Sequence, residues 1–181
     1  MNRAFVIDDN GAIVGRYDKM HLFDVDLPTG ESWRESAVYA GGAEAVMVAG
    51  TPVGDLGLAI CYDLRFPALF ERLTDAGAEV LAVPAAFTVP TGEAHWHVLL
   101  RARAIEAGVF IVAAAQSGEH ADGRRTYGHS LVVDPWGEML LDMGEGIGVG
   151  FADLDLARVA EVRSRLPAIR HRRPIGDPAR H

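Results

Sequence analysis

The sequence predicts an α/β protein, and three observations carry that prediction. After residue 61, segments with helical periodicity alternate with short apolar segments of strand length. Residues 93–107 place Trp96, Leu99 and Leu100 near one face of an amphipathic helix. Residues 109–115 are apolar throughout, which is typical of a strand covered by helices on both faces.

The part of the chain before residue 61 predicts two strand pairs separated by a long loop. Strands at 4–7 and 12–17 flank an Asp-Asp-Asn-Gly turn, and strands at 44–49 and 56–60 form the second pair. Residues 20–42 show no sustained periodicity. A loop of that length inside a compact domain is usually functional or disordered.

The rest of the chain predicts three helices and further strands. We expect helices at 67–76, 93–107 and 156–165, strands at 79–83, 109–115, 129–133, 138–141 and 148–153, and a polar loop at 117–125. Residues 166–181 form a basic tail. Such a tail is either solvated or an arm that reaches an acidic partner subunit.

Composition limits the classes of protein to consider. A chain of 181 residues suits a single domain, here 1–181, and its net charge of −8 disfavours binding to nucleic acid or an anionic membrane. No apolar run approaches the roughly 20 residues of a membrane span. One cysteine cannot form an internal disulfide, so we expect a reducing, cytoplasmic setting.

Seven histidines raise the question of a metal site. His95 and His97 lie two residues apart on a predicted helix, so their side chains diverge by about 200° and cannot share an ion. No Cys–His pair or His-Glu-x-x-His spacing occurs in the sequence. We expect neither a metal nor another cofactor.

Cys61 is the residue that most directly indicates chemistry. It ends an apolar strand-like run and begins a segment that turns into a helix, a junction that exposes a side chain at the edge of a sheet. Taken alone, a lone cysteine is more often a small buried hydrophobe. Lys19 changes that interpretation, because an ammonium group lowers the pKa of a nearby thiol and stabilises an oxyanion.

Three segments resemble the carbon–nitrogen hydrolase (nitrilase) superfamily. They are YDKMHLFD at 17–24, GLAICYDLRFP at 57–67 and YGHSLVVDPWG at 127–137. Together with AFT at 86–88, TG at 91–92, HW at 95–96 and LRARAIE at 100–106, they look most like Nit-type amidases, and closer to deaminated-glutathione amidases than to ω-amidases. The resemblance implies a nitrilase-type α-β-β-α sandwich, N-terminally incomplete, that assembles as a homodimer or higher homo-oligomer.

The resemblance also implies roles for three catalytic residues. Cys61 is the nucleophile, and Lys19, together with the backbone N–H of Tyr62, holds the tetrahedral oxyanion. Glu35 matches the position of a second, supporting glutamate that positions Lys19 or orients the substrate amide. As an isolated residue, Glu35 is only a loop acid.

Further residues are expected to bind substrate. Arg65 matches a position where relatives grip a substrate carboxylate, and a structural salt bridge is the alternative. Phe87 and Thr88 follow a strand at its C-terminal end, where open sheets place ligands. Ordinary packing is the alternative for Phe87. Asp63 and Arg103 are expected to be structural, and His129 a hydrogen-bonded core residue.

The general base of the family is a glutamate well upstream of the lysine, whereas this chain begins shortly before Lys19. We therefore expect weak or no activity unless an upstream segment is supplied, since positioned proton transfer contributes about 10²–10⁴-fold. The predicted function is a thiol-dependent amidohydrolase that cleaves the carboxamide of a small amide-bearing acid through a thioester and releases ammonia. The alternatives are an inactive binding scaffold, an N-carbamoyl amino acid hydrolase and a nitrilase.

Overall fold

The computed structural model describes residues 1–26, 30, 32–121 and 123–180. The chain starts with an antiparallel hairpin of β1 (Arg3–Ile7) and β2 (Ile13–Asp18), as the turn sequence predicted. The predicted loop 20–42 lies partly outside the described residues. Its described part contains the short antiparallel pair β3 (Asp24–Asp26) and β4 (Ser32–Arg34), followed by the 3₁₀ turn η1 (Glu35–Ala37).

One mixed sheet of six strands forms the centre of the protein, which confirms the α/β prediction. Its spatial order is β12-β11-β8-β7-β6-β5, and β6, β7 and β8 are parallel while the outer pairings are antiparallel. The strands are β5 (Met47–Thr51), β6 (Gly54–Leu58), β7 (Val80–Ala82), β8 (Phe110–Ala113), β11 (Leu131–Val133) and β12 (Met139–Asp142).

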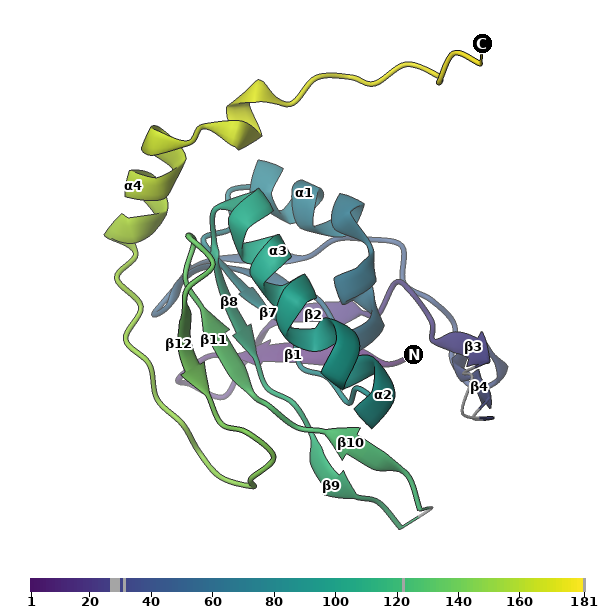
Figure 1. Ribbon diagram of the computed structural model, residues 1–181. Coiled ribbons are helices and arrows are strands. Elements are labelled where there is room, and N and C mark those ends of the chain that lie inside the picture. The colour runs from purple at the N-terminus through teal and green to yellow at the C-terminus, as the bar shows by residue number, and fades with distance from the viewer. Residues whose placement is uncertain (27–29, 31, 122, 181) are drawn as a thin grey trace.

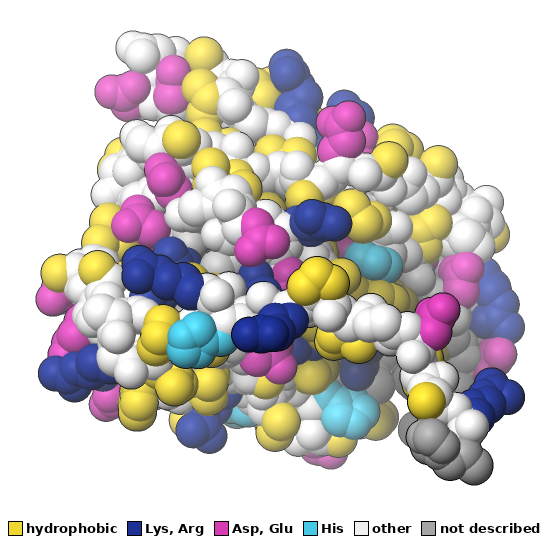
Figure 2. All heavy atoms as spheres, turned by 90° about the horizontal axis from the view of Figure 1, so that it is seen from above, with side chains coloured by type: hydrophobic (Ala, Val, Ile, Leu, Met, Phe, Trp, Pro, Cys, Tyr) yellow, Lys and Arg dark blue, Asp and Glu magenta, His cyan; other side chains and the backbone are white. Residues whose placement is uncertain are grey.

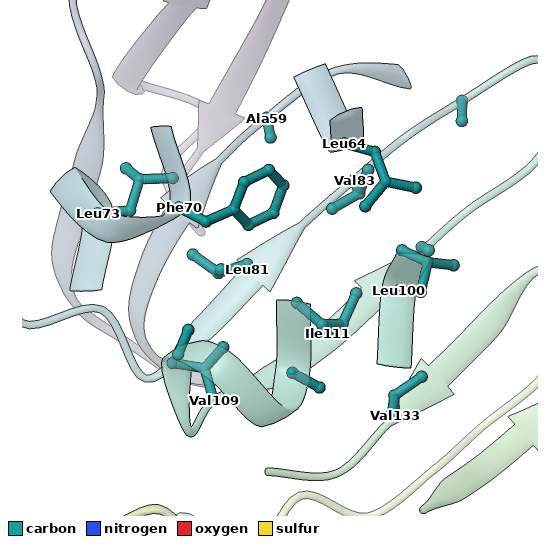
Figure 3. Close-up of a cluster of buried hydrophobic side chains, with 14 of the residues drawn as sticks. Ala59, Leu64, Phe70, Leu73, Leu81, Val83, Leu100, Val109, Ile111 and Val133 are labelled. Atoms are coloured by element: carbon teal, nitrogen blue, oxygen red, sulfur yellow. The ribbon is translucent and has the colours of Figure 1, made fainter. Parts of the chain in front are cut away.

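Helices α1 (Pro67–Asp75) and α3 (His97–Ala107) connect the parallel strands and lie together over one face of the sheet (Figure 1). The β1–β2 hairpin lies behind the sheet in the same view. Apolar side chains from α1, α3 and the sheet pack together between the helices and the sheet (Figure 3). Leu64, Leu81, Leu100, Ile111 and Val133 are all fully buried there.

The helix predicted at 93–107 begins earlier than expected. A turn of α2 (Val89–Thr91) and a turn of π-helix, η3 (Gly92–Trp96), precede α3. A Cβ atom at Gly92 would collide with the ring of Tyr127, so this position has room only for glycine. The close contact brings the start of the helix against the strand that contains Tyr127.

Two other predictions from the sequence are wrong. Residues 117–125 are not only loop, because β9 (Ser117–Glu119) and β10 (Arg125–Tyr127) pair across them. Residues 148–153 form no strand. Val149 and Phe151 are almost fully exposed, and among the described residues no strand pairs with this segment, so its alternating pattern lacks the partner that would bury it.

The C-terminal part begins with α4 (Ala157–Arg165), close to the predicted helix, and continues through the 3₁₀ turn η4 (Ala168–His171). Arg163, in α4 just before the basic tail, donates to the backbone oxygens of Ala78, Ala107 and Gly108 and so has a structural role. Arg172 still pairs with Asp75 of α1, and residues 173–180 then run away from the body of the protein (Figure 1). Basic and acidic side chains are interspersed on the face seen in Figure 2. Within the described residues, no helix has the length and apolar character to cross a membrane.

Candidate active site

The C-terminal ends of β6, β7 and β8 open onto a cavity of about 590 Å³. Parallel strands place the residues that follow them at one edge of the sheet, which is where open α/β sheets bind ligands. Residues in and next to the β1–β2 hairpin and the β3–β4 pair also line the cavity. All seven site residues predicted from the sequence line this cavity: Lys19, Glu35, Cys61, Tyr62, Arg65, Phe87 and Thr88.

Cys61 lies on a sharp turn directly after β6. Its φ angle is 49°, and among the described residues only His129 is another non-glycine with positive φ. The Cys61 N–H donates to the oxygen of Pro84 at 2.9 Å, which joins the turn to the chain beyond β7. A β-strand followed by a strained residue is the geometry that presents a nucleophile to a ligand.

The turn after Cys61 differs from the simple strand-to-helix junction that the sequence predicted. A 3₁₀ turn, η2 (Cys61–Arg65), follows Cys61, and α1 begins only at Pro67. The thiol therefore lies at a short 3₁₀ turn rather than at the N-terminus of α1. The macrodipole of α1 therefore stabilises a thiolate at Cys61 only weakly, because that effect falls off within a turn.

Asp63, within this turn, is fully buried and holds the two halves of the site together. Its carboxylate accepts the hydroxyl of Tyr17 at 2.7 Å and the backbone N–H groups of Ile60 at 2.9 Å and His21 at 3.0 Å. The ring Nδ1 of His21 lies 2.8 Å from the same carboxylate. Asp63 is thus structural, as predicted, and it fixes the segment on either side of Lys19 to the segment beside Cys61.

Lys19 is the only lysine in the chain, and its side chain is buried, with 3% exposed. It forms a close ion pair with Glu35, whose carboxylate also accepts the side-chain amide of Asn2 and the backbone N–H of Phe23. Burial by itself raises the pKa of Glu35, but these hydrogen bonds outweigh it and hold that pKa below its usual range. Glu35 is therefore an ionised carboxylate that holds the ammonium group in the cavity.

The electrostatics of Cys61 correct one expectation from the sequence. Burial raises the pKa of the thiol, and this effect outweighs the hydrogen bond from the Ala86 backbone and the positive charge of Lys19, which both lower it. Glu35 and Asp63 add to the rise. The pKa of Cys61 is thus raised rather than lowered, and at neutral pH the resting group is the protonated thiol.

Arg65 extends over the cavity beside two aromatic rings. Its guanidinium lies 5.4 Å from the ring centre of Phe87 and 5.9 Å from that of Tyr62. Within the described part of the chain, Arg65 makes no salt bridge, and its hydrogen-bond partner is His95 Nδ1 at 3.3 Å. The structural salt bridge considered as an alternative is therefore absent there, and the guanidinium is available to an anionic ligand.

Phe87 and Thr88 are both buried at the cavity wall. Phe87 also packs on Trp96, with 4.7 Å between ring centres, so it serves the core and the cavity together. The Thr88 hydroxyl lies 2.8 Å from that of Thr91. These contacts fix the part of the cavity wall that Phe87 and Thr88 form.

The cavity has further lining residues that the sequence did not indicate. Asn2 contacts Glu35, and Trp33 and Arg124 lie against each other with 5.0 Å between the guanidinium and the ring centre. The indole N–H of Trp33 is buried without a hydrogen-bond partner among the described residues. Trp33 lies in the predicted loop 20–42 and Arg124 in the predicted loop 117–125. Neither segment has a hydrophobic periodicity that could indicate which side chains face the cavity.

Comparison with known proteins identifies the family. The profile described as "Carbon-nitrogen hydrolase" matches residues 1–164. The chain belongs to the carbon-nitrogen hydrolase family. Within this family, it is 48% identical over 174 residues to a Dictyostelium discoideum protein named deaminated glutathione amidase, and 47% identical over 173 residues to the human protein of that name. These alignments cover 95% and 96% of this chain but only 60% and 53% of the relatives.

Solved structures of carbon-nitrogen hydrolases agree with the fold. The C. elegans NitFhit protein matches with a TM-score of 0.87 and 46% identity, over 93% of this chain and 41% of that chain. A glutamate-to-glutamine mutant of the amidase from Nesterenkonia sp. AN1 matches with a TM-score of 0.73 and 27% identity, over 91% of this chain and 61% of that chain. In that amidase, acrylamide has added to the active site cysteine.

The role of Asp63 predicts a large loss of stability when its charge is removed. Asp63→Asn replaces one accepting oxygen with an NH₂ group, which would face a hydrogen-bond donor in the buried site. We therefore expect the free energy of unfolding, measured in urea, to fall by about 2–4 kcal/mol. Asp75→Asn is the control, since its ion pair with Arg172 is exposed, and we expect little change. Equal small effects in both variants would contradict the structural role of Asp63.

The raised pKa of Cys61 predicts slow alkylation near neutral pH. Iodoacetamide should react with the folded protein only at higher pH than with the urea-unfolded chain, because alkylation follows the thiolate. Lys19→Met removes a charge that lowers the thiol pKa, so alkylation at fixed pH should slow by about a further tenfold. Arg16→Met, an exposed change on the same hairpin, is the control. A folded-state midpoint below that of the unfolded chain would contradict this electrostatic picture.

Proposed function

We propose that this chain is a thiol-dependent amidase that cleaves the carboxamide of a small acid. The observation that carries this proposal is that a strained cysteine and a buried ammonium group line one cavity, close enough for the charge of Lys19 to act on the thiol. A cysteine supplies the nucleophile, and a preorganised cation stabilises the negative charge that develops on the substrate oxygen. The relatives that are 46–48% identical are named amidases, which supports amide hydrolysis.

In the proposed reaction, the sulfur of Cys61 attacks the amide carbon and a C–S bond forms. The carbonyl electrons move onto the oxygen, where the ammonium of Lys19 and the N–H of Tyr62 hold them. Collapse of this intermediate breaks the C–N bond, and the thiol proton leaves with the nitrogen as ammonia. Water then attacks the thioester, giving the carboxylic acid and returning a proton to the sulfur.

Proton transfer is the demanding part of this sequence. Glu35 is the one carboxylate among the described lining residues, and its ion pair with Lys19 and its low pKa make it a poor base. Because the resting thiol is protonated, we propose that this chain turns over slowly unless a further carboxylate is supplied.

We propose that the substrate is a small acid that carries the amide, with its carboxylate bound by Arg65. A guanidinium without an ion-pair partner in the described cavity suits a carboxylate, and Phe87 and Tyr62 beside it provide apolar surface. Deaminated glutathione, which the relatives' name mentions, is also an acid with amide bonds, but these are peptide bonds, so the same thiol chemistry would release an amine from it in place of ammonia. Homo-oligomer formation and a cytoplasmic setting stay predictions.

The pairing of Glu35, the one carboxylate among the described lining residues, with Lys19 favours a second candidate function, a binding protein that keeps the cavity without turnover. Such a protein would bind the amide-bearing acid and release no ammonia. An N-carbamoyl amino acid hydrolase or a nitrilase would use the same thiol chemistry on a different group, and a substrate panel separates these activities.

The test is amide hydrolysis by the 181-residue chain, measured as ammonia release from a small carboxylic acid with a terminal carboxamide and as cysteinylglycine release from deaminated glutathione. We expect slow release that Cys61→Ala abolishes, and Arg65→Met should raise KM by about tenfold or more with a smaller effect on kcat, since Arg65 contacts the substrate away from the reacting bond. Arg72→Met on α1, an exposed arginine outside the cavity, is the matched control.

The outcomes distinguish the candidate functions. Release that continues in Cys61→Ala would contradict the thiol mechanism. Substrate binding by calorimetry with no release by the unaltered chain would favour the binding protein. Release from an N-carbamoyl amino acid or a nitrile in preference to the amide would assign the chain to one of the other activities.

A further inference from the structure

A second group of chemically active side chains lies outside the cavity. His97 is the first residue of α3, His129 precedes β11, and Asp142 is the last residue of β12. His97 Nε2 lies 3.0 Å from Asp142 Oδ2, and His129 Nδ1 lies 2.9 Å and 3.1 Å from the two oxygens of the same carboxylate. One ligand atom from each of the three residues falls within 4.8 Å of the others.

We propose that His97, His129 and Asp142 bind a divalent transition-metal ion, with Zn²⁺ as the best match. Two imidazoles and a carboxylate are ligands that zinc prefers, and a tetrahedral site with bonds of about 2.0–2.2 Å places its ligand atoms about 3.4 Å apart. The observed separations from the carboxylate are a few tenths of an ångström shorter. Small side-chain rotations therefore open the group enough to admit the ion.

The backbone around His129 holds its ring in place for this role. His129 has φ 54°, an uncommon conformation for a non-glycine residue. Its N–H donates to the oxygen of Gly144 at 2.7 Å, and its own oxygen accepts the indole N–H of Trp96 at 2.7 Å. Backbone strain is common at binding and active sites. With this proposal, both described non-glycine residues with positive φ have such a place: Cys61 in the cavity and His129 in the metal site.

The side chains around the group restrict it further. The ring of Tyr127 stacks on that of His129, with 4.4 Å between ring centres and 21° between planes. The N–H of Gly144 donates to Asp142 Oδ1 at 2.9 Å, which fixes the orientation of the carboxylate. Outer contacts of this kind orient metal ligands and strengthen binding.

The group also has an open side for a water ligand. The side chains of His97, His129 and Asp142 are 26%, 20% and 31% exposed. Three protein ligands and one solvent position form a common zinc arrangement. The ion would tie α3 to β11 and β12, so its expected effect is on stability rather than on the chemistry at Cys61.

The sequence offered no sign of this site, because its ligands come from three separated elements. The prediction that no metal binds rested on residues close together in the chain, and His95 and His97 do point to different partners, Arg65 and Asp142. His129 was predicted to be a core residue. Its side chain is hydrogen-bonded, as expected, but it is partly exposed and faces Asp142.

The test is calorimetric titration of the chelator-treated, full 181-residue chain with Zn²⁺. We expect one equivalent to bind with micromolar affinity. His97→Gln and Asp142→Asn should each weaken binding by about tenfold or more, because each removes a ligand. His120→Gln is the matched control: this histidine contacts Thr126 and lies outside the group. Near-ultraviolet circular dichroism without metal checks that each variant is folded, and His97→Gln carries the test if Asp142→Asn does not fold.

A Co²⁺ titration separates this site from the thiol of Cys61. We expect the visible bands of bound cobalt without a thiolate charge-transfer band, and binding that survives Cys61→Ser. Zn²⁺ should raise the Tm of the unaltered chain and of His120→Gln but not that of His97→Gln. No zinc binding, equal binding by His97→Gln, or binding lost in Cys61→Ser would overturn the proposal.

Discussion

Buried Asp63 joins the β1–β2 hairpin to the turn that carries Cys61, through bonds to Tyr17, His21 and Ile60. His21 and Asp63 are 42 positions apart in the chain, so this carboxylate closes a long loop. A buried charge is stable only when hydrogen bonds replace its hydration. Because two of these partners flank Lys19, the same bonds that satisfy the carboxylate also bring the ammonium group to the cavity. The relation between Lys19 and Cys61 depends on this contact.

The cavity combines opposing electrostatic effects. Burial favours the neutral thiol, while Lys19 favours the thiolate, and burial prevails at Cys61. The paired Glu35 reduces the influence of the ammonium on the resting thiol, and it also prevents an uncompensated buried charge. The site is thus better arranged to stabilise a negative oxygen on a bound substrate than to keep a free thiolate. This arrangement makes the proposed activity depend on a proton acceptor.

The sequence predicted the parts of the protein whose patterns are local. The Asp-Asp-Asn-Gly turn indicated the first hairpin, and the strand before Cys61 indicated the nucleophile position. Contacts between segments far apart in the chain were harder to predict, because no local sequence pattern encodes them. The β3–β4 and β9–β10 pairs are three-residue strands, too short for periodicity to detect, and 148–153 has a strand pattern without a partner. Trp33, Arg124 and the group around Asp142 meet only after folding. The raised pKa of Cys61 likewise depends on burial, which a motif does not encode.

The most direct test of the account is covalent acylation of Cys61, followed by intact-protein and peptide mass spectrometry. A nitrophenyl ester of a small dicarboxylic acid releases nitrophenolate, which needs no general acid, and the thiol proton passes to solvent. The ester therefore probes the nucleophile and the oxyanion site directly. Lys19 is the only lysine, which keeps competing acylation low. The account predicts one acyl group on the peptide containing Cys61, formed about 10²-fold more slowly in Lys19→Met. Acylation elsewhere at the same rate, or an equal adduct in Cys61→Ala, would contradict it.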